Sequence, residues 1–354
     1  MNSPATSPTP GRSLTGRAFV HPAFDLLVIG GGLSLVVTLV VVLAPGDARS
    51  EYANWSFLLY VILLSNSTHF AASTVRLYTK PGAYRALPFL TMGFPLVFAA
   101  ILVLCLVFAR QIGPHVQALY LTWSPFHYAA QAYGLAVMYS YRSGCLLTAG
   151  DKKLLWWISM VPFSYMLLFT PAAGLQHVVS AEQMRTVPLL LDTLAWVQSV
   201  LPWVAFAAVV GLCVKVWNSP SGPMPVVSVL AVFTNAVWFF ILEPLQAFVW
   251  ATIFHGIQYL GIVIVFHVKD QLARPDNRRG TAYHVVSFYL LSLLLAYGLF
   301  ECLPSGFVAV GFGPVESTLM VLAAINVHHF IVDAYIWRLG RGDSNRRVVE
   351  EAAA

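Results

Sequence analysis

Six histidines lie in or beside long apolar stretches of this sequence. An ionisable side chain within a membrane span is a candidate for function, because its burial in hydrocarbon costs free energy unless it faces protein or water. We treat these rings as candidate metal ligands: His21 in VHPAFDLL, His69 in LLSNSTHFAAS, His127 in WSPFHYAAQ, His255 in ATIFHGIQYL, and His328 and His329 in INVHHFIVDAYIW.

The two adjacent histidines point in different directions if the chain is helical there. Residues three and four apart share a helix face, so His329 shares its face with Asp333, whereas His328 is rotated by about 100°. Asp333 can accept the second ring N–H of His329, which is how a liganding imidazole is usually oriented. The spacing favours His329 as a ligand and Asp333 as a catalytic or orienting group, and leaves His328 as a second ligand or a wall residue.

The same spacing gives two other histidines a polar neighbour. The stripes are Trp123, His127, Gln131 and Gly134 in one segment, and His255 with Tyr259 in another. Gln131 and Tyr259 therefore join Asp333 as candidate catalytic groups.

The ligand types restrict the choice of metal. Neutral imidazoles suit iron, copper or zinc, and the four cysteines are scattered without CxxC spacing. This pattern argues against iron–sulfur and structural zinc sites and leaves iron, with copper or haem as alternatives. Five aromatic residues are expected to line an apolar substrate tunnel beside the metal: Trp123, Tyr128, Tyr133, Trp238 and Phe254.

Composition identifies the elements that must position these residues. Apolar residues make up 58% of the 354 residues and charged residues only 10%, which is typical of a polytopic membrane protein rather than a soluble domain. A span needs about 20 mostly apolar residues, and that criterion predicts an all-α bundle of about ten spans. The expected segments are 24–44, 54–75, 86–109, 114–141, 154–170, 189–214, 224–242, 244–268, 284–302 and 312–337.

The basic residues predict the orientation. With a cytoplasmic amino terminus, only Arg49, Arg110 and Arg185 of the 20 Lys and Arg residues fall on the outer side, as the positive-inside rule requires. We therefore expect both termini in the cytoplasm, and a location in the bacterial inner membrane. The net charge of +5 reflects topology and not nucleic-acid binding. Residues 1–23 and 339–354 are expected to be cytoplasmic tails, the first disordered, around one transmembrane domain at 24–338.

The candidate ligands share one depth range. A helix rises about 1.5 Å per residue, so His69 lies roughly 10 Å from the nearest inner basic residue, residues 328–329 roughly 14 Å, and His127 and His255 roughly 20 Å. His21 lies at the inner boundary. We expect one site between the inner surface and the midplane.

Four short patches resemble a known family. They are His21-Pro22-Ala23-Phe24-Asp25, His69-Phe70, His255 through Tyr259, and His328 with Asp333. In order and type they are similar to the motifs of the bacterial membrane β-carotene cleavage dioxygenases of the Brp/Blh type. The resemblance implies a non-haem Fe(II) held by histidines and O2-dependent cleavage or hydroxylation of an isoprenoid or lipid.

The sequence departs from that family at one ligand position. Tyr259 stands where the family has the second histidine of a His-x3-His pair, and His127, outside the family pattern, is a candidate for the missing ligand. The membrane fatty-acid desaturases and hydroxylases are a second comparison, but their HxxHH box fails here because Ile325 precedes His328 by three.

These observations support four functions. The first is a metal-dependent oxidoreductase that takes an apolar small molecule from the bilayer. The second is a transporter, for which polar residues would form a continuous line from Glu243 or Glu316 to His267. The third is a haem protein with two axial histidines, and the fourth is a purely structural membrane protein.

Overall fold

The chain forms an all-helical bundle in a computed structural model that describes residues 14–45, 57–218, 222–338 and 344–351. No strand occurs in these four ranges. The first half contains α1 (Pro22–Phe24), the π-helix η1 (Asp25–Ile29), α2 (Gly32–Leu43), α4 (Phe57–Ile62), the π-helix η2 (Leu63–Ser67), α5 (Thr68–Thr79), α6 (Ala83–Ala86), η3 (Phe89–Gly93), α7 (Phe94–Val107), α8 (Ala109–Arg142) and α9 (Ala149–Phe169).

The second half continues with helices of very different length. They are α10 (Gly174–Val178), α11 (Ala181–Arg185), α12 (Pro188–Trp217), α13 (Val226–Ile241), α14 (Pro244–Leu272), α15 (Thr281–Tyr297), the π-helix η4 (Gly298–Cys302), α16 (Leu303–Ala309), α17 (Pro314–Ile336) and α18 (Ser344–Glu350). The short α10 and α11 occupy the connection between α9 and α12, which are themselves long.

Membrane crossing is supported by seven helices that are long and apolar enough, within the described ranges. An eighth is a pair, Pro22–Ile29 and Gly32–Leu43, bent by 52° at its break. The prediction of an all-helical bundle with several membrane spans is therefore confirmed, whereas the predicted number of about ten spans is not. Of the predicted segments, 114–141 falls in α8, which carries many polar residues, and 224–242 falls in α13, which has only 16 residues.

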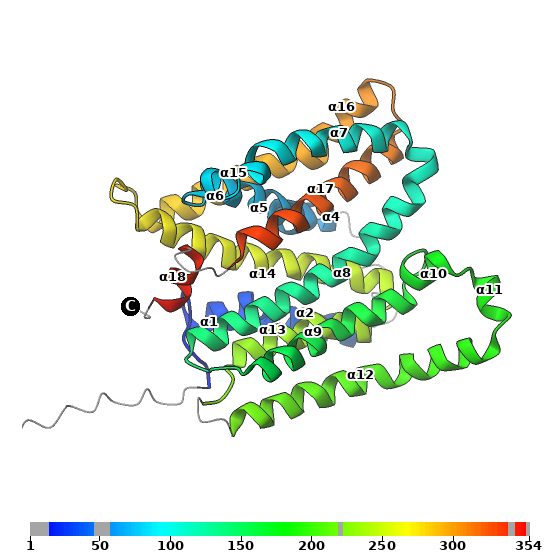
Figure 1. Ribbon diagram of the computed structural model, residues 1–354, viewed down its shortest axis with the longest axis horizontal. Coiled ribbons are helices and arrows are strands. Elements are labelled where there is room, and N and C mark those ends of the chain that lie inside the picture. Colours follow the sequence, from blue (N-terminus) through cyan, green and yellow to red (C-terminus); the bar gives the residue numbers. More distant parts are fainter. Residues whose placement is uncertain (1–13, 46–56, 219–221, 339–343, 352–354) are drawn as a thin grey trace, which may run out of the picture.

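The helices pack in two groups that α8 joins (Figure 1). One group contains α5, α7, α15, α16 and α17, and the other contains α2, α9, α12 and α13. Helix α8 packs against α17 on one side and against α9 and α13 on the other, while α14 contacts α5, α13 and α15. Side chains between α5, α8, α14 and α17 are therefore inside the bundle.

Both described ends of the chain meet at one end of the bundle, which we call the basic end. There the Arg142 guanidinium donates to the backbone carbonyls of Ala18, Val348 and Glu351 at 2.9 to 3.2 Å. Residues 14–23 of the predicted disordered tail thus pack on the bundle, as does α18 within the predicted carboxyl-terminal tail. Residues 1–13, 339–343 and 352–354 of those predicted tails lie outside the described ranges.

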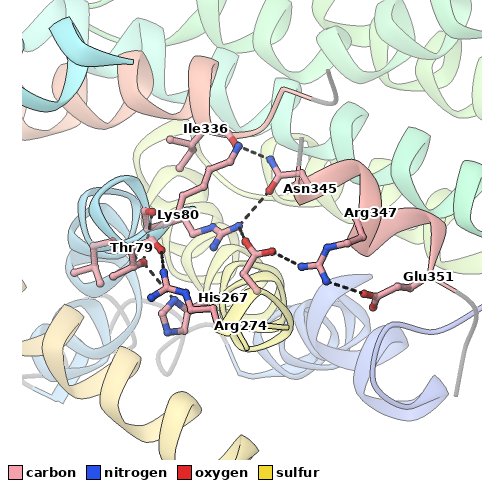
Figure 2. Close-up of polar contacts among 11 residues, drawn as sticks. Thr79, Lys80, His267, Arg274, Ile336, Asn345, Arg347 and Glu351 are labelled. Atoms are coloured by element: carbon pink, nitrogen blue, oxygen red, sulfur yellow. Dashed lines mark hydrogen bonds and ion pairs between the residues drawn. The ribbon is translucent and has the colours of Figure 1, made fainter. Parts of the chain in front are cut away.

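Helix α18 is held to the basic end by an ionic network (Figure 2). Asp270 of α14 pairs with Arg76 at 2.6 Å and with Arg347 at 2.9 Å. Arg76 is 1% exposed and also donates to Asn345 at 3.2 Å. Lys80 donates to the carbonyl of Ile336 at 3.0 Å, which ties α5 to the end of α17.

Candidate metal centre

Four of the six predicted histidines meet inside the bundle. They come from four helices: His69 from α5, His127 from α8, His255 from α14 and His329 from α17. Their ring centroids form a closed circuit of 4.9 Å from His69 to His255, 5.0 Å on to His127, 4.8 Å on to His329 and 4.7 Å back to His69. All four side chains are buried, with at most 9% exposed.

A π-helical turn and a glycine bring α5 and α14 together. The π-helix η2 directly precedes α5, and such turns occur frequently at functional sites. Its backbone passes so close to Gly256 that a Cβ there would lie 3.0 Å from Asn66 Cα and from the carbonyl carbon and oxygen of Ser65. Because Gly256 follows His255 and Asn66 precedes His69 by three, this contact sets the spacing of the two imidazoles.

The donor atoms are close enough to share one ion. Nε2 of His127 and Nε2 of His329 are 3.0 Å apart, about the separation expected for two nitrogens that each lie about 2.0–2.1 Å from one metal ion. Donor atoms of His69, His255 and His329 lie within 4.8 Å of one another, and those of His127, His329 and Asp333 do so as well. The two groups share His329, so they form one centre.

Several ring nitrogens in this centre have no hydrogen-bond partner among the described residues. These include Nε2 of His69, Nε2 of His255 and Nδ1 of His329. Buried polar atoms are nearly always hydrogen-bonded, and an exception requires an explanation such as an ion. In the described ranges neither donor group contains a cysteine, so imidazoles with one carboxylate remain. That set fits iron, copper or zinc.

Asp333 connects the imidazoles to a phenol. One carboxylate oxygen accepts the hydroxyl of Tyr259 at 2.7 Å. The other lies 3.5 Å from Nε2 of His329 and 3.7 Å from Nε2 of His127. Asp333 therefore lies beside His329 as predicted, but next to Nε2, the nitrogen that faces His127, whereas Nδ1 of His329 has no partner among the described residues. Tyr259, which replaces a histidine of the family pattern, contacts the centre through this carboxylate.

Two predicted ligands, His328 and His21, lie away from the centre. His328 is rotated to the other side of α17, where its ring stacks on Phe94 at 5.1 Å with an interplanar angle of 15°. His21 is exposed, and its Nδ1 accepts the backbone N–H of Ala23 at 3.2 Å as the N-cap of α1. The geometry brings neither ring into the donor set.

The His21 and Asp25 patch of the family resemblance forms a turn in this structure. Asp25 is fully buried and accepts backbone N–H groups of Phe19, Val20 and His21 at 2.6 to 3.3 Å. It also accepts the hydroxyl of Tyr139 at 2.7 Å. These bonds fold the amino-terminal segment onto α8, which accounts for the patch without a metal.

A cavity of about 430 Å³ borders the centre between α8, α14 and α17. Its wall includes His127, Tyr259 and Asp333 from the centre, and the predicted residues Trp123, Gln131 and Tyr133. Gln131 also donates to the backbone carbonyl of His255 at 3.4 Å. The predicted stripe of Trp123, His127, Gln131 and Gly134 therefore faces one hollow space.

The other predicted substrate residues lie around a separate cavity of only about 20 Å³. Trp238 and Phe254 stack at 5.5 Å with an interplanar angle of 13°, and Tyr128 packs 4.4 Å from the ring of His255. The hydroxyl of Tyr128 is hydrogen-bonded to Thr252 at 2.7 Å. Tyr128, Trp238 and Phe254 thus form packed core behind His255 and do not line the larger cavity.

Two residues of the site were missed by the sequence reasoning. The ring of Phe330 lies 4.5 Å from that of His127 and lines the cavity. The side-chain oxygen of Asn66 is buried without a partner in the described ranges. Asn66 precedes His69 by three, so the spacing that selected Asp333 also points to it.

Comparison of the chain with protein-family models, curated proteins and solved structures finds no match. The resemblance to the Brp/Blh type therefore depends on the four sequence patches, of which the His21 patch has the structural role described above.

Proposed function

We propose that the chain is a membrane-embedded oxidoreductase in which His69, His127, His255 and His329 hold one metal ion, Fe(II) in the first place. The observation that carries this proposal is the meeting of four buried imidazoles, of which His69, His255 and His329 have ring nitrogens with no hydrogen-bond partner among the described residues. Leaving these nitrogens without a partner would be costly, because each buried polar atom left unsatisfied costs about 1–3 kcal/mol.

Iron is the metal that the resemblance of the four sequence patches implies. The donor set of imidazoles with the Asp333 carboxylate beside His127 and His329 suits iron as well as copper or zinc. A bound iron would supply a coordination position for O2. The protein would contribute burial, the Tyr259 hydroxyl held by Asp333, and an adjoining cavity with few polar groups for an isoprenoid or lipid. We place the protein in a bacterial inner membrane with its basic end in the cytoplasm.

A haem site and a transport function are supported less well than a metal centre held by imidazoles. Adjacent imidazole centroids are only 4.7 to 5.0 Å apart, which leaves no space for a porphyrin between two axial rings. A transport path would need polar residues toward Glu243, yet on that side of His255 helix α14 buries Phe248, Ala251 and Phe254.

The test compares two adjacent histidines. Protein purified in detergent from iron-supplemented cells is analysed for metal content as wild type, His329→Ala and His328→Ala. We expect near-stoichiometric iron in wild type and in His328→Ala, and loss of most of it in His329→Ala. A wild type without metal, or equal metal in both variants, would contradict the proposal. An optical spectrum with a Soret band would identify haem instead.

A further inference from the structure

The cavity beside the centre reaches the outer surface of the bundle between α8 and α17. Most of its lining residues are buried or half-buried, but Gly134 of α8 and Ala334 of α17 are exposed. They are the smallest residues of the wall, together with Ala130. A side opening framed by a glycine and an alanine leaves space between two helices whose other residues pack closely.

The distance of this opening from the basic end follows from the positions of Gly134 and Ala334 in their helices. Gly134 precedes Arg142 by eight residues and Ala334 precedes Arg338 by four, which places them about 12 Å and about 6 Å from the basic end along their helices. In the proposed orientation both helices cross the bilayer with the basic end at its cytoplasmic surface, so exposed residues at that height face lipid. The opening therefore leads to the lipid of the leaflet on the basic side.

The wall matches the chemistry of a hydrocarbon chain. The cavity volume of about 430 Å³ lies within the usual range of about 300–1,000 Å³ for small-molecule sites. Aromatic rings of Trp123, Phe126 and Phe330 line it, and the polar groups His127 and Asp333 lie where it meets the imidazoles. Such a surface places an apolar chain along the wall and its reacting atoms at the histidines.

We propose that Gly134 and Ala334 frame a lateral portal through which the hydrocarbon chain of a lipid-dissolved substrate passes from the leaflet at the basic end to the histidine centre. This inference rests on the proposed function, and it adds the route and the two residues that control it. An isoprenoid chain and an acyl chain share the required chemistry, and the experiment distinguishes them.

Gly134 allows a clean test because a Cβ added there meets no atom within 4 Å. Gly134→Phe should fill the portal without distorting α8. Gly211→Phe is the matched control, because Gly211 is also exposed, also has no atom within 4 Å of an added Cβ, and lies on α12 away from the cavity. Ala334→Phe closes the portal from the opposite wall and serves as a second variant.

Binding is measured in lipid nanodiscs with all-trans-retinol and cis-parinaric acid as fluorescent probes, and metal content is measured in parallel. We expect saturable binding of one probe to wild type and Gly211→Phe, and at least tenfold weaker binding to Gly134→Phe and Ala334→Phe, with metal content unchanged. Retinol binding identifies an isoprenoid site and parinaric acid binding an acyl site.

The portal is contradicted if neither probe binds saturably, or if both portal variants bind like Gly211→Phe. Because the readout is binding, a wild type that binds a probe but contains no metal would overturn the proposed function while supporting the portal.

Discussion

Asp333 is the residue whose contacts link the histidines to the cavity. It lies 3.5 Å from Nε2 of His329 and holds the hydroxyl of Tyr259 at 2.7 Å. In the proposed centre, a carboxylate in that position would bind the metal directly or orient the imidazole. Either role makes the affinity of the centre depend on its charge, because mutations of such outer partners typically weaken metal binding about 10–100-fold.

Asp333→Asn should therefore lower metal affinity by about 10-fold or more, whereas Tyr259→Phe, which keeps the carboxylate, should retain the metal. Competition with a chromophoric chelator during equilibrium dialysis measures both affinities. If Asp333→Asn binds metal as tightly as wild type, the carboxylate has no part in the centre.

Residue spacing predicted part of the site. The 100° rotation between adjacent residues distinguished His329 from His328, and the i, i+4 rule placed Asp333 beside His329. The same rule placed the stripe from Trp123 to Gly134 on one face, and these residues do line one cavity, while their role toward a substrate stays a prediction. His21 was misjudged because depth alone could not show that its ring caps α1. Tyr128 and Trp238 were misplaced because aromatic character does not distinguish a packed core from a hollow wall.

At the scale of elements, Gly256 controls the distance between α14 and η2. An added Cβ would meet backbone atoms of Ser65 and Asn66 at 3.0 Å, and backbone cannot rotate out of the way. The sequence could not reveal this contact, because a π-helical turn has no composition that distinguishes it from an ordinary helix. In the sequence, only Gly256 indicates that α14 and η2 approach each other closely.

Gly256→Ala should separate α14 from η2 and destabilise the protein by about 1–3 kcal/mol, as overpacking usually does. It should also reduce metal content, because His255 moves away from His69. Gly113→Ala is the control, since its nearest atom, Met320 Cε, is at an ordinary 3.8 Å. Thermal unfolding in detergent and metal analysis test both variants, and a Gly256→Ala protein indistinguishable from Gly113→Ala would refute the argument.

For the whole molecule, the composition established a helical membrane bundle but not the number of spans. Helix α8 borders the centre and the cavity, so its polar residues reduce the apolar signal by which spans are recognised. The polar residues of α8 that indicated a site therefore also made α8 harder to recognise as a membrane span. Nor could composition show that the described segments around Ala18 and Val348 meet at Arg142.

The ionic network at the basic end holds the bundle and α18 together. Removing the charge of Asp270 leaves the buried Arg76 uncompensated, which typically costs about 3–5 kcal/mol. Arg347, whose side chain is 43% exposed, should contribute at most about 1 kcal/mol. Asp270→Asn should therefore lower the unfolding temperature in detergent far more than Arg347→Ala, and equal shifts would show that the pair is not buried in the membrane-embedded protein.

The four imidazoles also carry a consequence for biosynthesis. His69 lies in α5, whereas His329 belongs to α17, the last long helix in the described ranges. During translation the first three rings would enter the bilayer well before the fourth, and the Val348 carbonyl that accepts from Arg142 follows only with α18. The four proposed ligands are present together only after α17 has been synthesised, so in the proposed centre the metal would be acquired by a chain whose earlier helices have already been inserted.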